Sequence, residues 1–386
     1  MSDFDCIVVG AGVEGSSAAY SLAKSGLKTL LLEKFPVPHT RGSSHGASRI
    51  IRYTYPADVP VYQSIMPDAH AKWRQLETAT GEKLLRTTGM VWLGLIRNGN
   101  IRAMKHLLTQ HNVPCELWSA SALNVRYPQL RYTNEYEALW EPNAGVLAAD
   151  KCVAAFQREF RKYGGQLNDC EQAEKIVPVD QNACTVTTNK GTYYAKHVVL
   201  CLGSWAGPFI KQHLNLDLKL RTEVMKVAYW PDRDGSHRLS NGFPCVCDDD
   251  FYGIPCNEYP GLFKFCAHTG YTAEPGRRDA VTSQTINQQL DSAARQLLRF
   301  YPNIHPEPAI VETCIYTISP TRQPYIDRHP VHHNVIVAAG FSGHGFKLAP
   351  VVGDMVTCLV HNRPIPYDMR LFAISHDLAA HSASKL

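Results

Sequence analysis

The chain has 386 residues, of which 45% are hydrophobic, so it can bury a large core and form more than one domain. Its 39 basic and 35 acidic residues give a formal net charge of only +4 and are spread along the chain. This composition argues against an intrinsically disordered protein, and also against a nucleic-acid-binding protein, which would need a clustered basic surface.

The 12 cysteines do not indicate a disulfide scaffold, because the chain is long and its start, Met1 to Asp5, lacks the features of a secretory signal. We therefore expect reduced thiols. Cys245-Val246-Cys247, followed by three aspartates, is the nearest approach to a metal motif, but it lacks a second Cys/His pair at zinc-site spacing. We interpret it as a strand with an acidic turn and expect no metal.

The last three residues, Ser384, Lys385 and Leu386, form the tripeptide address for peroxisomal import. This signal is read at the extreme C-terminus, and the residues before it are small and polar. The alternative is a chance polar tail. We expect an import receptor as a partner and the peroxisome as the location, and no apolar run approaches membrane-spanning length.

The first predicted elements surround a glycine-rich turn near the N-terminus. Cys6–Val9 is predicted as a short buried strand, and Ser16–Ala23 as a helix of mostly small residues. Thr29–Leu32 is predicted as a second strand, ending at Glu33. Strand, turn, helix and strand in this order predict the β-α-β unit of a dinucleotide-binding fold.

The turn between the first strand and the helix contains Gly10, Gly12 and Gly15. Glycine at these positions permits a tight turn, close approach of the backbone to a pyrophosphate, and packing of the helix on the strand. The helix N-terminus stabilises phosphate charge, and Glu33, roughly 20 residues on, can accept hydrogen bonds from the adenosine ribose. The turn predicts a dinucleotide but does not choose between NAD and FAD.

Further elements follow in chain order. The segment from Pro36 to Pro56 is polar and rich in Gly, Ser and Arg, and we interpret it as a long loop. Residues from about Leu218 to Thr282 alternate between apolar and polar, which predicts an antiparallel sheet. Helices are also predicted over Ile65–Gly81, Asn98–His111 and Lys151–Tyr163, and strands over Gly89–Gly94, Thr185–Thr188, His197–Gly203 and Asn334–Gly340.

Three longer motifs carry more specific information than the glycine turn. Arg41–Arg52, Cys314–Thr317 and Gly340–Pro350 together resemble the monomeric sarcosine oxidase family, including the eukaryotic peroxisomal sarcosine and L-pipecolate oxidases. The resemblance extends over nearly the whole chain in the same order and spacing. It implies that the dinucleotide is FAD.

The resemblance also implies the fold class. We expect an α/β protein in which an FAD-binding, Rossmann-like domain of the glutathione-reductase type is interwoven with an α+β substrate domain built on an antiparallel sheet. The FAD-binding domain is expected to comprise residues 1–80, 150–215 and 320–386, and the substrate domain residues 81–149 and 216–319.

In this family FAD is attached through a thioether from a cysteine to the flavin methyl carbon, and Cys314 stands at the matching place. The other 11 cysteines we interpret as small buried hydrophobes. The residues assigned to FAD by the glycine turn and the resemblance are Gly10, Gly12, Val13, Glu14, Gly15, Glu33, Lys34, Ser44, His45, Ser48, Arg49, Ala173, Gly203, Trp205, Cys314, Gly343, Gly345, Phe346 and Lys347.

The resemblance places His45 and Arg49 against the flavin ring, and Lys264 and His268 on its far side. These four residues are the expected catalytic groups. Lys264 is thought to assist oxygen reduction, which agrees with a fixed cation stabilising developing negative charge. The residues assigned to substrate binding are Arg52, Lys347, Tyr252, Tyr316 and Gly343, of which the first two clamp a carboxylate.

The expected activity is oxidation of a small secondary amino acid such as sarcosine, L-pipecolate or L-proline. A hydride equivalent passes to the flavin and the electrons pass to O2, giving H2O2, while the imine hydrolyses. We expect a monomer. Two alternatives remain open: a flavin dehydrogenase with a different electron acceptor, and a non-catalytic dinucleotide-binding protein.

The chain departs from the family pattern at two places. Ala267 stands where a larger aromatic residue is expected, and Ser319-Pro320-Thr321 replaces a usual Thr-Pro-Asp. We expect both changes to affect the pocket wall more than the flavin, so the preferred substrate is the least certain inheritance.

Overall fold

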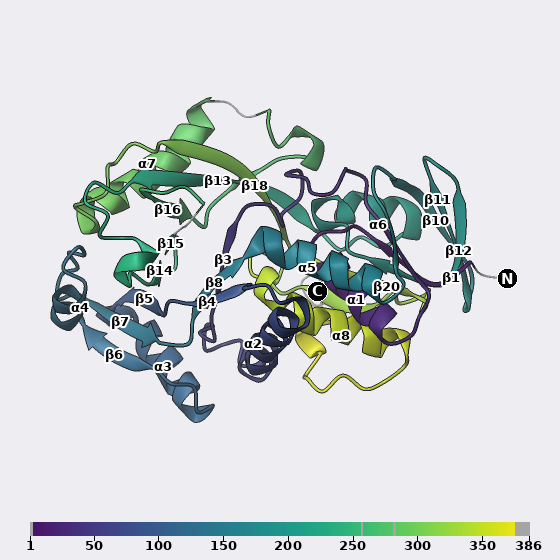
Figure 1. The fold of residues 1–386 in the computed structure, drawn as a ribbon, viewed down its shortest axis with the longest axis horizontal. Coiled ribbons are helices and arrows are strands. Elements are labelled where there is room, and N and C mark those ends of the chain that lie inside the picture. The colour runs from purple at the N-terminus through teal and green to yellow at the C-terminus, as the bar shows by residue number, and fades with distance from the viewer. Residues whose placement is uncertain (1–2, 256–257, 281–282, 375–386) are drawn as a thin grey trace, which may run out of the picture.

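The computed structural model describes residues 3–255, 258–280 and 283–374. Figure 1 shows two sheets at opposite ends of an elongated molecule, with helices α1 (Val13–Lys24), α5 (Ala149–Lys162) and α8 (Ala349–Val360) near its middle. The C-terminal tripeptide Ser384–Leu386 lies outside the described residues. No helix among the described residues has the length and hydrophobicity needed to cross a lipid bilayer.

The first sheet has eight strands around β1 (Phe4–Val9), which pairs in parallel with β2 and β12. The predicted β-α-β unit is confirmed, because β1, α1 (Val13–Lys24) and β2 follow one another directly. Strand β20 also pairs in parallel with β12, and its residues are all buried. The other strands are β2 (Thr29–Leu32), β9 (Gln166–Asn168), β10 (Ala173–Asp180), β11 (Ala183–Thr188), β12 (Thr192–Leu200), β19 (Tyr325–Arg328) and β20 (Val335–Ala339).

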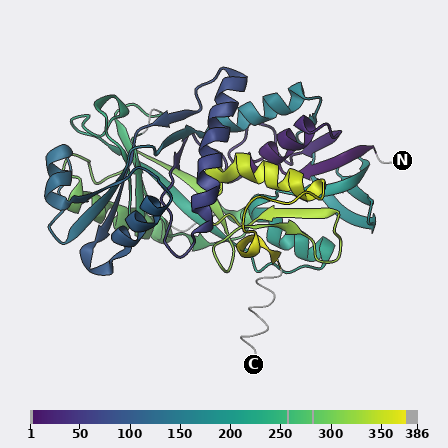
Figure 2. The same ribbon diagram turned by 90° about the horizontal axis from the view of Figure 1, so that it is seen from below.

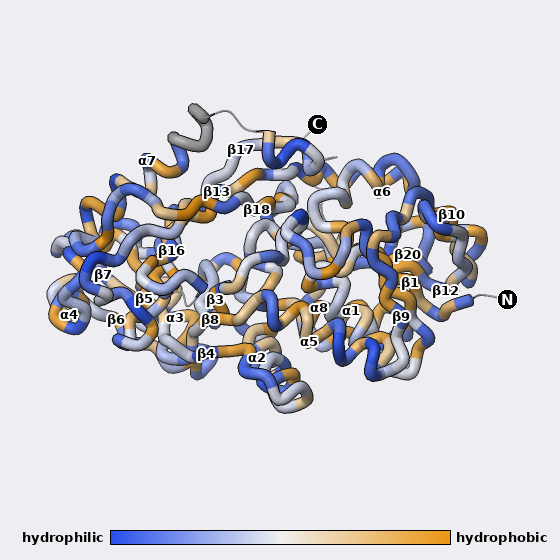
Figure 3. Tube along the Cα trace, turned by 45° about the horizontal axis from the view of Figure 1, so that its top comes forward, coloured by the Kyte–Doolittle hydropathy of each residue, from blue (hydrophilic) through white to orange (hydrophobic). Residues whose placement is uncertain are grey.

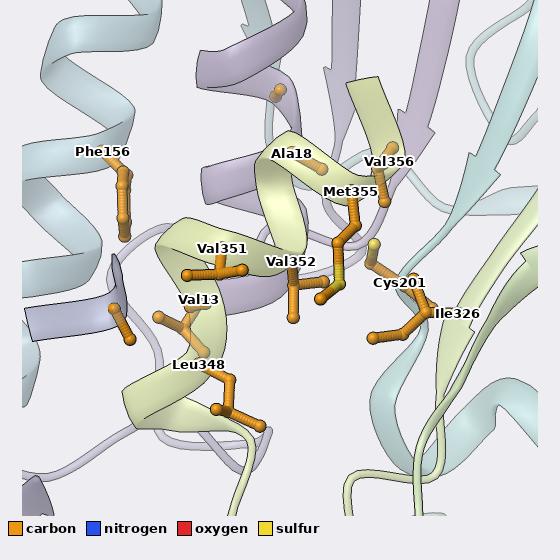
Figure 4. Close-up of a cluster of buried hydrophobic side chains, with 14 of the residues drawn as sticks. Val13, Ala18, Phe156, Cys201, Ile326, Leu348, Val351, Val352, Met355 and Val356 are labelled. Carbon is orange, nitrogen blue, oxygen red and sulfur yellow. The ribbon is translucent and has the colours of Figure 1, made fainter. Parts of the chain in front are cut away.

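Small residues allow close packing of helices on this sheet. Gly353 of α8 (Ala349–Val360) lies against α1, because a Cβ there would come within 2.5 Å of the Ser17 hydroxyl oxygen. The Ser17 hydroxyl donates to the Ala349 carbonyl at 2.7 Å. Figure 4 shows Val13 of α1 close to Val351 and Val352 of α8. The N-terminus of α1 is thereby held rigidly at the sheet edge.

Two further helices complete this layer, and one covers the opposite face. Helices α2 (Val61–Thr80) and α5 (Ala149–Lys162) pack beside α8 and α1, and Figure 2 shows α2 near the middle of the molecule. Their observed bounds confirm the helices predicted over Ile65–Gly81 and Lys151–Tyr163. Helix α6 (Ala206–Leu214) packs against the other face of the sheet.

The second sheet has nine strands, and all but one of its pairings are antiparallel. The exception is the parallel pairing of β14 with β5, which joins two parts of the chain far apart in sequence. The nine-stranded sheet consists of β5 (Met90–Leu95), β6 (Glu116–Ser119), β7 (Tyr136–Glu141), β13 (Arg221–Pro231), β14 (Cys245–Cys247), β15 (Phe251–Ile254), β16 (Leu262–Ala267), β17 (Tyr271–Thr272) and β18 (Ile310–Ile318). Helices α3 (Asn100–Gln110), α4 (Ala120–Arg126) and α7 (Ser283–Phe300) supply side chains to its hydrophobic clusters.

A small three-stranded sheet corrects one prediction. The segment Pro36–Pro56, interpreted as a loop, contains the strand β3 (Ser48–Ile51), which pairs with β8 (Gly145–Ala148). Strand β4 (Leu85–Thr87) pairs with the other edge of β8. The sequence of β3 is polar, and its pairing partner β8 lies almost a hundred residues further along the chain. No local pattern therefore indicated this strand.

The two large sheets draw on different parts of the chain. All strands of the eight-stranded sheet fall in the residues predicted for the FAD-binding domain, and those of the nine-stranded sheet in the residues predicted for the substrate domain. The exact domain boundaries remain a prediction. Figure 3 shows hydrophobic residues along β1 and β20, in keeping with strands that are covered on both faces.

Candidate active site

A cavity of about 1220 Å³ lies between the two large sheets. It exceeds the roughly 300–1,000 Å³ typical of pockets for small ligands, so it has room for a dinucleotide and a second small molecule. Of the residues predicted for the site, only Gly15 does not line this cavity. The structure therefore brings together side chains that are spread over more than 300 residues of sequence.

The glycine turn lies at the carboxyl end of β1. Gly10 has a φ of +101°, and a Cβ on it would lie 2.4 Å from the Cys201 carbonyl oxygen. A Cβ on Gly15 would lie 1.8 Å from the Gly10 carbonyl oxygen, so Gly15 serves the packing of helix on strand. The first turn of α1 opens toward the cavity beside Gly12 and Val13. This arrangement fits a bound pyrophosphate.

Glu33 follows β2 and is positioned by the same turn. Its carboxylate accepts hydrogen bonds from the backbone N–H of Ala11 at 2.8 Å and of Phe35 at 3.0 Å. Burial raises the pKa of this carboxyl, but the hydrogen bonds from His39, Ala11 and Phe35 outweigh it and hold the pKa below its usual value. The ionised carboxylate has lone pairs left for a ribose hydroxyl.

Four more assigned residues line the cavity around Glu33. Lys34 lies next to Glu33, with its ammonium 6.0 Å from the centroid of the Trp205 ring. Trp205 and Gly203 form the short helix η2 (Gly203–Trp205) after β12, and Ala173 begins β10. A dinucleotide whose ribose contacted Glu33 would place its adenosine half among these residues.

Arg49 organises the loop that precedes β3. Its guanidinium donates to the carbonyls of Ser48 at 2.8 Å, Ser43 at 3.0 Å and His45 at 2.6 Å. The His45 Nδ1 lies 2.7 Å from the Gly42 carbonyl oxygen. Burial, aided by Arg49, lowers the pKa of His45. Arg49 is thus a fixed cation in the cavity wall, and the Ser44 hydroxyl of the same loop accepts from the N–H of Val13 at 2.9 Å.

Cys314 lies in β18, the strand that pairs with β13 along its whole length. The thiol is free, only 4% of the residue is exposed, and its sulfur is 3.9 Å from the Ser43 carbonyl oxygen. The Cys314 sulfur therefore lies where the loop that contains Ser43 meets strand β18 of the nine-stranded sheet.

Lys264 of β16 and His268 beyond it lie in the same wall. Lys264 is 2% exposed, and its ammonium donates to the Ser48 hydroxyl at 3.1 Å. Burial and the nearby Arg49 lower the pKa of Lys264. Burial, with Arg52 and Lys347, lowers the pKa of His268 to about 4, so its imidazole is neutral at pH 7.

The side-chain cations of Arg52 and Lys347 both lie near the ring of Tyr55. The Arg52 guanidinium lies 4.8 Å from the Tyr55 ring and 4.5 Å from the Trp92 ring, and Lys347 lies 5.2 Å from the Tyr55 ring. Lys347 Nζ donates to the His344 carbonyl at 3.0 Å. Within the described chain, neither cation has an ion-pair partner, and the Arg52 Nη1 is buried without a hydrogen bond.

The segment that carries Lys347 is closely packed. Gly343 has a φ of +87°, and a Cβ on it would lie 2.4 Å from the Tyr316 ring. A Cβ on Gly345 would likewise lie 2.7 Å from Phe341. Phe346 stacks on Trp73, whose indole N–H donates to the Lys347 carbonyl at 3.0 Å. Lys347 therefore has a fixed position.

Tyr252 and Tyr316 line the cavity from β15 and β18. The Tyr252 ring lies 5.0 Å from the ring of His268. The two departures from the family pattern differ in their position, because Thr321 lines the cavity whereas Ala267 does not. The expectation that Ala267 shapes the pocket wall is wrong, since the alternation of side chains along β16 turns it away from the face of Lys264.

Several cavity residues were missed from the sequence. Tyr55 and Trp92 hold Arg52 between their rings, and Trp92 lies on a strand of the other sheet. Glu14, by contrast, was predicted for the FAD site; both of its carboxylate oxygens are buried without a hydrogen-bond partner among the described residues, and burial raises its pKa well above the usual value. Only the short spacing between Arg52 and Tyr55 offered a signal for any of these contacts.

Comparison with known proteins identifies the family. Residues 5–359 match the FAD-dependent oxidoreductase family. The chain is 38% identical to the peroxisomal sarcosine oxidase of Homo sapiens, with 96% of each chain covered. It is 30% identical to the monomeric sarcosine oxidase of Bacillus sp. (strain B-0618), covering 99% of this chain and 98% of that one.

The chain belongs to the FAD-dependent oxidoreductases and, among them, to the sarcosine oxidase family. The predicted cofactor, FAD, and the predicted enzyme class, a flavoprotein oxidase, are confirmed by this membership. Solved structures agree on the fold. The open form of NikD, an unusual amino acid oxidase, has a TM-score of 0.80 at 24% identity, covering 96% of this chain and 97% of that one. Glycine oxidase from Geobacillus kaustophilus has a TM-score of 0.78 at 19% identity, with 97% and 99% covered.

Proposed function

We propose that this protein oxidises small secondary amino acids, with sarcosine, L-pipecolate and L-proline as the candidate substrates. The observation that carries the proposal is the pair of cations Arg52 and Lys347, which line the FAD-sized cavity and have no ion-pair partner within the described residues. A buried guanidinium nitrogen without a hydrogen-bonding partner, such as the Arg52 Nη1, is costly, and a substrate carboxylate could accept a hydrogen bond from it.

Bound FAD would supply the redox chemistry, taking a hydride equivalent from the C–H bond beside the amine and passing two electrons to O2 to give H2O2. The protein orients the substrate, since Arg52 and Lys347 fix its carboxylate while Tyr252 and Tyr316 bound the cavity. The neutral imidazole of His268 is available to accept a proton. Lys264 stabilises the negative charge that develops on oxygen. The imine product then hydrolyses in water.

We propose that FAD is bound by the residues of the glycine turn, by Glu33 and by the loop before β3 whose carbonyls Arg49 holds (the Arg49 loop), and that it is covalently attached to Cys314. The position of Cys314 in β18, with its sulfur 3.9 Å from the Ser43 carbonyl oxygen, supports this assignment. Ser48, His45 and the segment Gly343–Lys347 would enclose the flavin end.

A peroxide-coupled screen of N-methyl and cyclic amino acids tests the activity. We expect H2O2 in a one-to-one ratio to the substrate consumed, with sarcosine or L-pipecolate among the best substrates. Consumption in air without H2O2 would instead indicate a dehydrogenase with another acceptor. Bound FAD that stays oxidised with every secondary amine would indicate a protein without turnover.

The peroxisome is the proposed location, and the protein is proposed to act as a monomer. The human and mouse relatives are named peroxisomal sarcosine oxidases, and the chain ends in Ser384-Lys385-Leu386. Import through this tripeptide places H2O2 production in the compartment that the address specifies. A fluorescent protein fused to the N-terminus should enter peroxisomes, and deletion of Leu386 should leave it in the cytosol. Sedimentation of the purified protein tests the monomer.

A further inference from the structure

A chain of hydrogen bonds leads away from Lys264 along the cavity wall. The Lys264 ammonium donates to the Ser48 hydroxyl at 3.1 Å, and that hydroxyl donates to the Glu258 carboxylate at 2.6 Å. These hydrogen bonds run from Lys264 toward Glu258, and rotation of the Ser48 hydroxyl would reverse their direction. The three side chains come from β16, β3 and the segment before β16, so the tertiary fold alone brings them together.

The inner and outer ends of this chain differ in their exposure. Lys264 and Ser48 are buried, at 2% and 3% exposure, whereas Glu258 is only half-buried. Both groups line the cavity, and the greater exposure of Glu258 lets its carboxylate exchange protons with water more readily than the buried Lys264 ammonium. A hydroxyl is able to accept one proton while donating another, which is the property that a bridging group in a proton path needs.

We propose that Glu258, acting through the Ser48 hydroxyl, returns protons to Lys264 during the reduction of oxygen. The inference rests on the proposed use of O2 as electron acceptor. It makes Ser48 a link in a proton path and Glu258 a positioning and proton-exchanging residue outside the flavin contacts.

The proton balance shows why such a path is needed. Reduction of O2 to H2O2 takes up two electrons and two protons, and bound FAD that had accepted a hydride equivalent would supply both electrons and one proton. Lys264 gives the second proton and becomes a neutral amine. The Ser48 hydroxyl then passes its proton to Lys264 while a proton from water reaches the Ser48 oxygen through the Glu258 carboxylate. One proton is thus taken from solvent in each reoxidation.

The other charged and titratable groups around Lys264 do not offer an equivalent route. Arg49 holds its protons permanently, and the thiols of Cys266 and Cys314 have no hydrogen bond to Lys264. Tyr229 lies with its ring 5.5 Å from the ammonium. Its hydroxyl instead contacts Glu258 at 3.5 Å and Glu312 at 3.3 Å, which ties the outer carboxylates together.

The test uses the FAD-loaded protein in two separate half-reactions. Each variant is reduced without oxygen, once with sarcosine and once with dithionite, and then mixed with oxygenated buffer. For Glu258→Gln we expect unchanged reduction by sarcosine and reoxidation slowed at least roughly tenfold, below the usual contribution of a general acid. Glu312→Gln is the matched control, because it leaves the path from Lys264 to Glu258 intact, and it should reoxidise like the parent.

A second readout does not depend on turnover. The visible absorbance of bound oxidised flavin should respond to loss of the Lys264 charge, so that its pH titration would report the pKa of that ammonium. Removing the Glu258 carboxylate should move this titration to lower pH by about 1 unit. Ser48→Ala should slow reoxidation as Glu258→Gln does, Ser48→Thr, which keeps a hydroxyl, should reoxidise faster than Ser48→Ala, and the double variant Ser48→Ala/Glu258→Gln should be no slower than either single one.

The outcomes separate the two proposals. Parent-like reoxidation and titration of Glu258→Gln, or equal slowing of both half-reactions, would overturn the proton path. If sarcosine and its analogues fail to reduce the parent, the proposed substrate class fails. The path is then still judged from the dithionite-reduced protein, where a Glu258-dependent reoxidation would support it. Should Glu258→Gln fail to bind FAD, the Ser48 pair decides.

Discussion

At the scale of single residues, the cavity wall contains four cationic side chains that the proposed reaction uses. Arg49, Arg52, Lys264 and Lys347 all line it, and burial lowers the pKa of both lysines. These four cations favour a carboxylate-bearing substrate, because its charge would neutralise charge that is costly to bury. The predictions at this scale concern the removal of one charge or one thiol at a time.

Arg52→Ala removes one arm of the carboxylate clamp. We expect the KM for sarcosine to rise by roughly 10- to 100-fold, the range expected for the loss of charge-assisted hydrogen bonds worth about 1.5–3 kcal/mol. Steady-state kinetics with peroxide detection measures this. Arg97→Ala is the matched control, because Arg97 is exposed and lies outside the cavity. An Arg52→Ala protein with the parent's KM would contradict the clamp.

The lowered pKa of Lys347 predicts how substrate binding depends on pH. Burial, and then the neighbouring Arg52, holds the pKa of Lys347 well below its usual value, while Cys247 and Glu14 act in the opposite direction. A carboxylate binds the protonated lysine better, so affinity should fall as the pH rises through this lowered pKa. Titration of a non-reactive carboxylate against the flavin absorbance measures the effect. Lys347→Met should bind weakly at every pH tested and lose this dependence.

Cys314→Ser tests covalent attachment. The parent, once denatured, should retain flavin fluorescence on the polypeptide, and the variant should release all its flavin. The serine keeps the size of the side chain but cannot form the thioether. Cys266→Ser is a control, because Cys266 lies two strands away in the same sheet and does not line the cavity. Flavin that stays bound to denatured Cys314→Ser would place the attachment elsewhere.

The sequence predicted those residues that stand in contiguous motifs, such as Arg49 and Arg52 or Gly343 and Lys347. It did not predict Trp92 or Glu258. Their neighbours, Arg52 and Ser48, are brought close only by the folding of segments far apart in the chain, and a tryptophan or a glutamate alone carries no specific signal. The sequence therefore could not predict site residues whose neighbours are brought close only by the tertiary structure.

At the scale of elements, the position of Arg52 depends on the end of β7. The Glu141 carboxylate is fully buried and accepts hydrogen bonds from the backbone N–H groups of Tyr53 and Thr54. These contacts fix the chain directly after Arg52. The buried acid thus connects the stability of the second sheet with the geometry of the substrate clamp.

Glu141→Ala should lower the free energy of unfolding by about 2–3 kcal/mol, because it leaves two buried N–H groups without acceptors. Urea denaturation followed by fluorescence measures the change. Glu174→Ala, at an exposed site, should lie near the parent. Any folded Glu141→Ala protein should also show a raised KM, and an unchanged stability would contradict the role given to this carboxylate.

Elements with strong hydrophobic patterns were predicted well. The strand and helix around the glycine turn were placed to within a few residues, because the strand is a short apolar run and the glycine turn separates it from the helix. Strand β3 was missed because its serine and arginine serve the cavity, and its pairing with β8 satisfies the backbone without an apolar pattern. Functional demands on a sequence weakened its structural signal there.

At the scale of the whole molecule, the cavity between the two sheets makes stability depend on FAD. Removal of the cofactor from Cys314→Ser protein should lower the melting temperature, and added FAD should restore it in a concentration-dependent manner. At a free FAD concentration of about 100 times Kd, the gain should be about 2.7 kcal/mol. Differential scanning calorimetry measures it, and a melting temperature independent of FAD would contradict a cofactor site in this cavity.

The global arrangement was predictable in outline. The family resemblance supplied two interwoven units, and the strands of the two large sheets fall on either side of the expected division. The three-stranded sheet and the parallel pairing of β14 with β5 were not foreseen. Both depend on long-range contacts that no local pattern encodes.

The free thiol of Cys314 stands on one sheet and the glycine turn on the other. If the proposed bond forms, the flavin end becomes a tether, and the adenosine end then rebinds its site at a high effective concentration. Damage to the adenosine site, as in Glu33→Gln, should therefore not release the cofactor but let its free end detach and return. Such a protein would stay yellow through prolonged dialysis, whereas the same change combined with Cys314→Ser would turn it colourless.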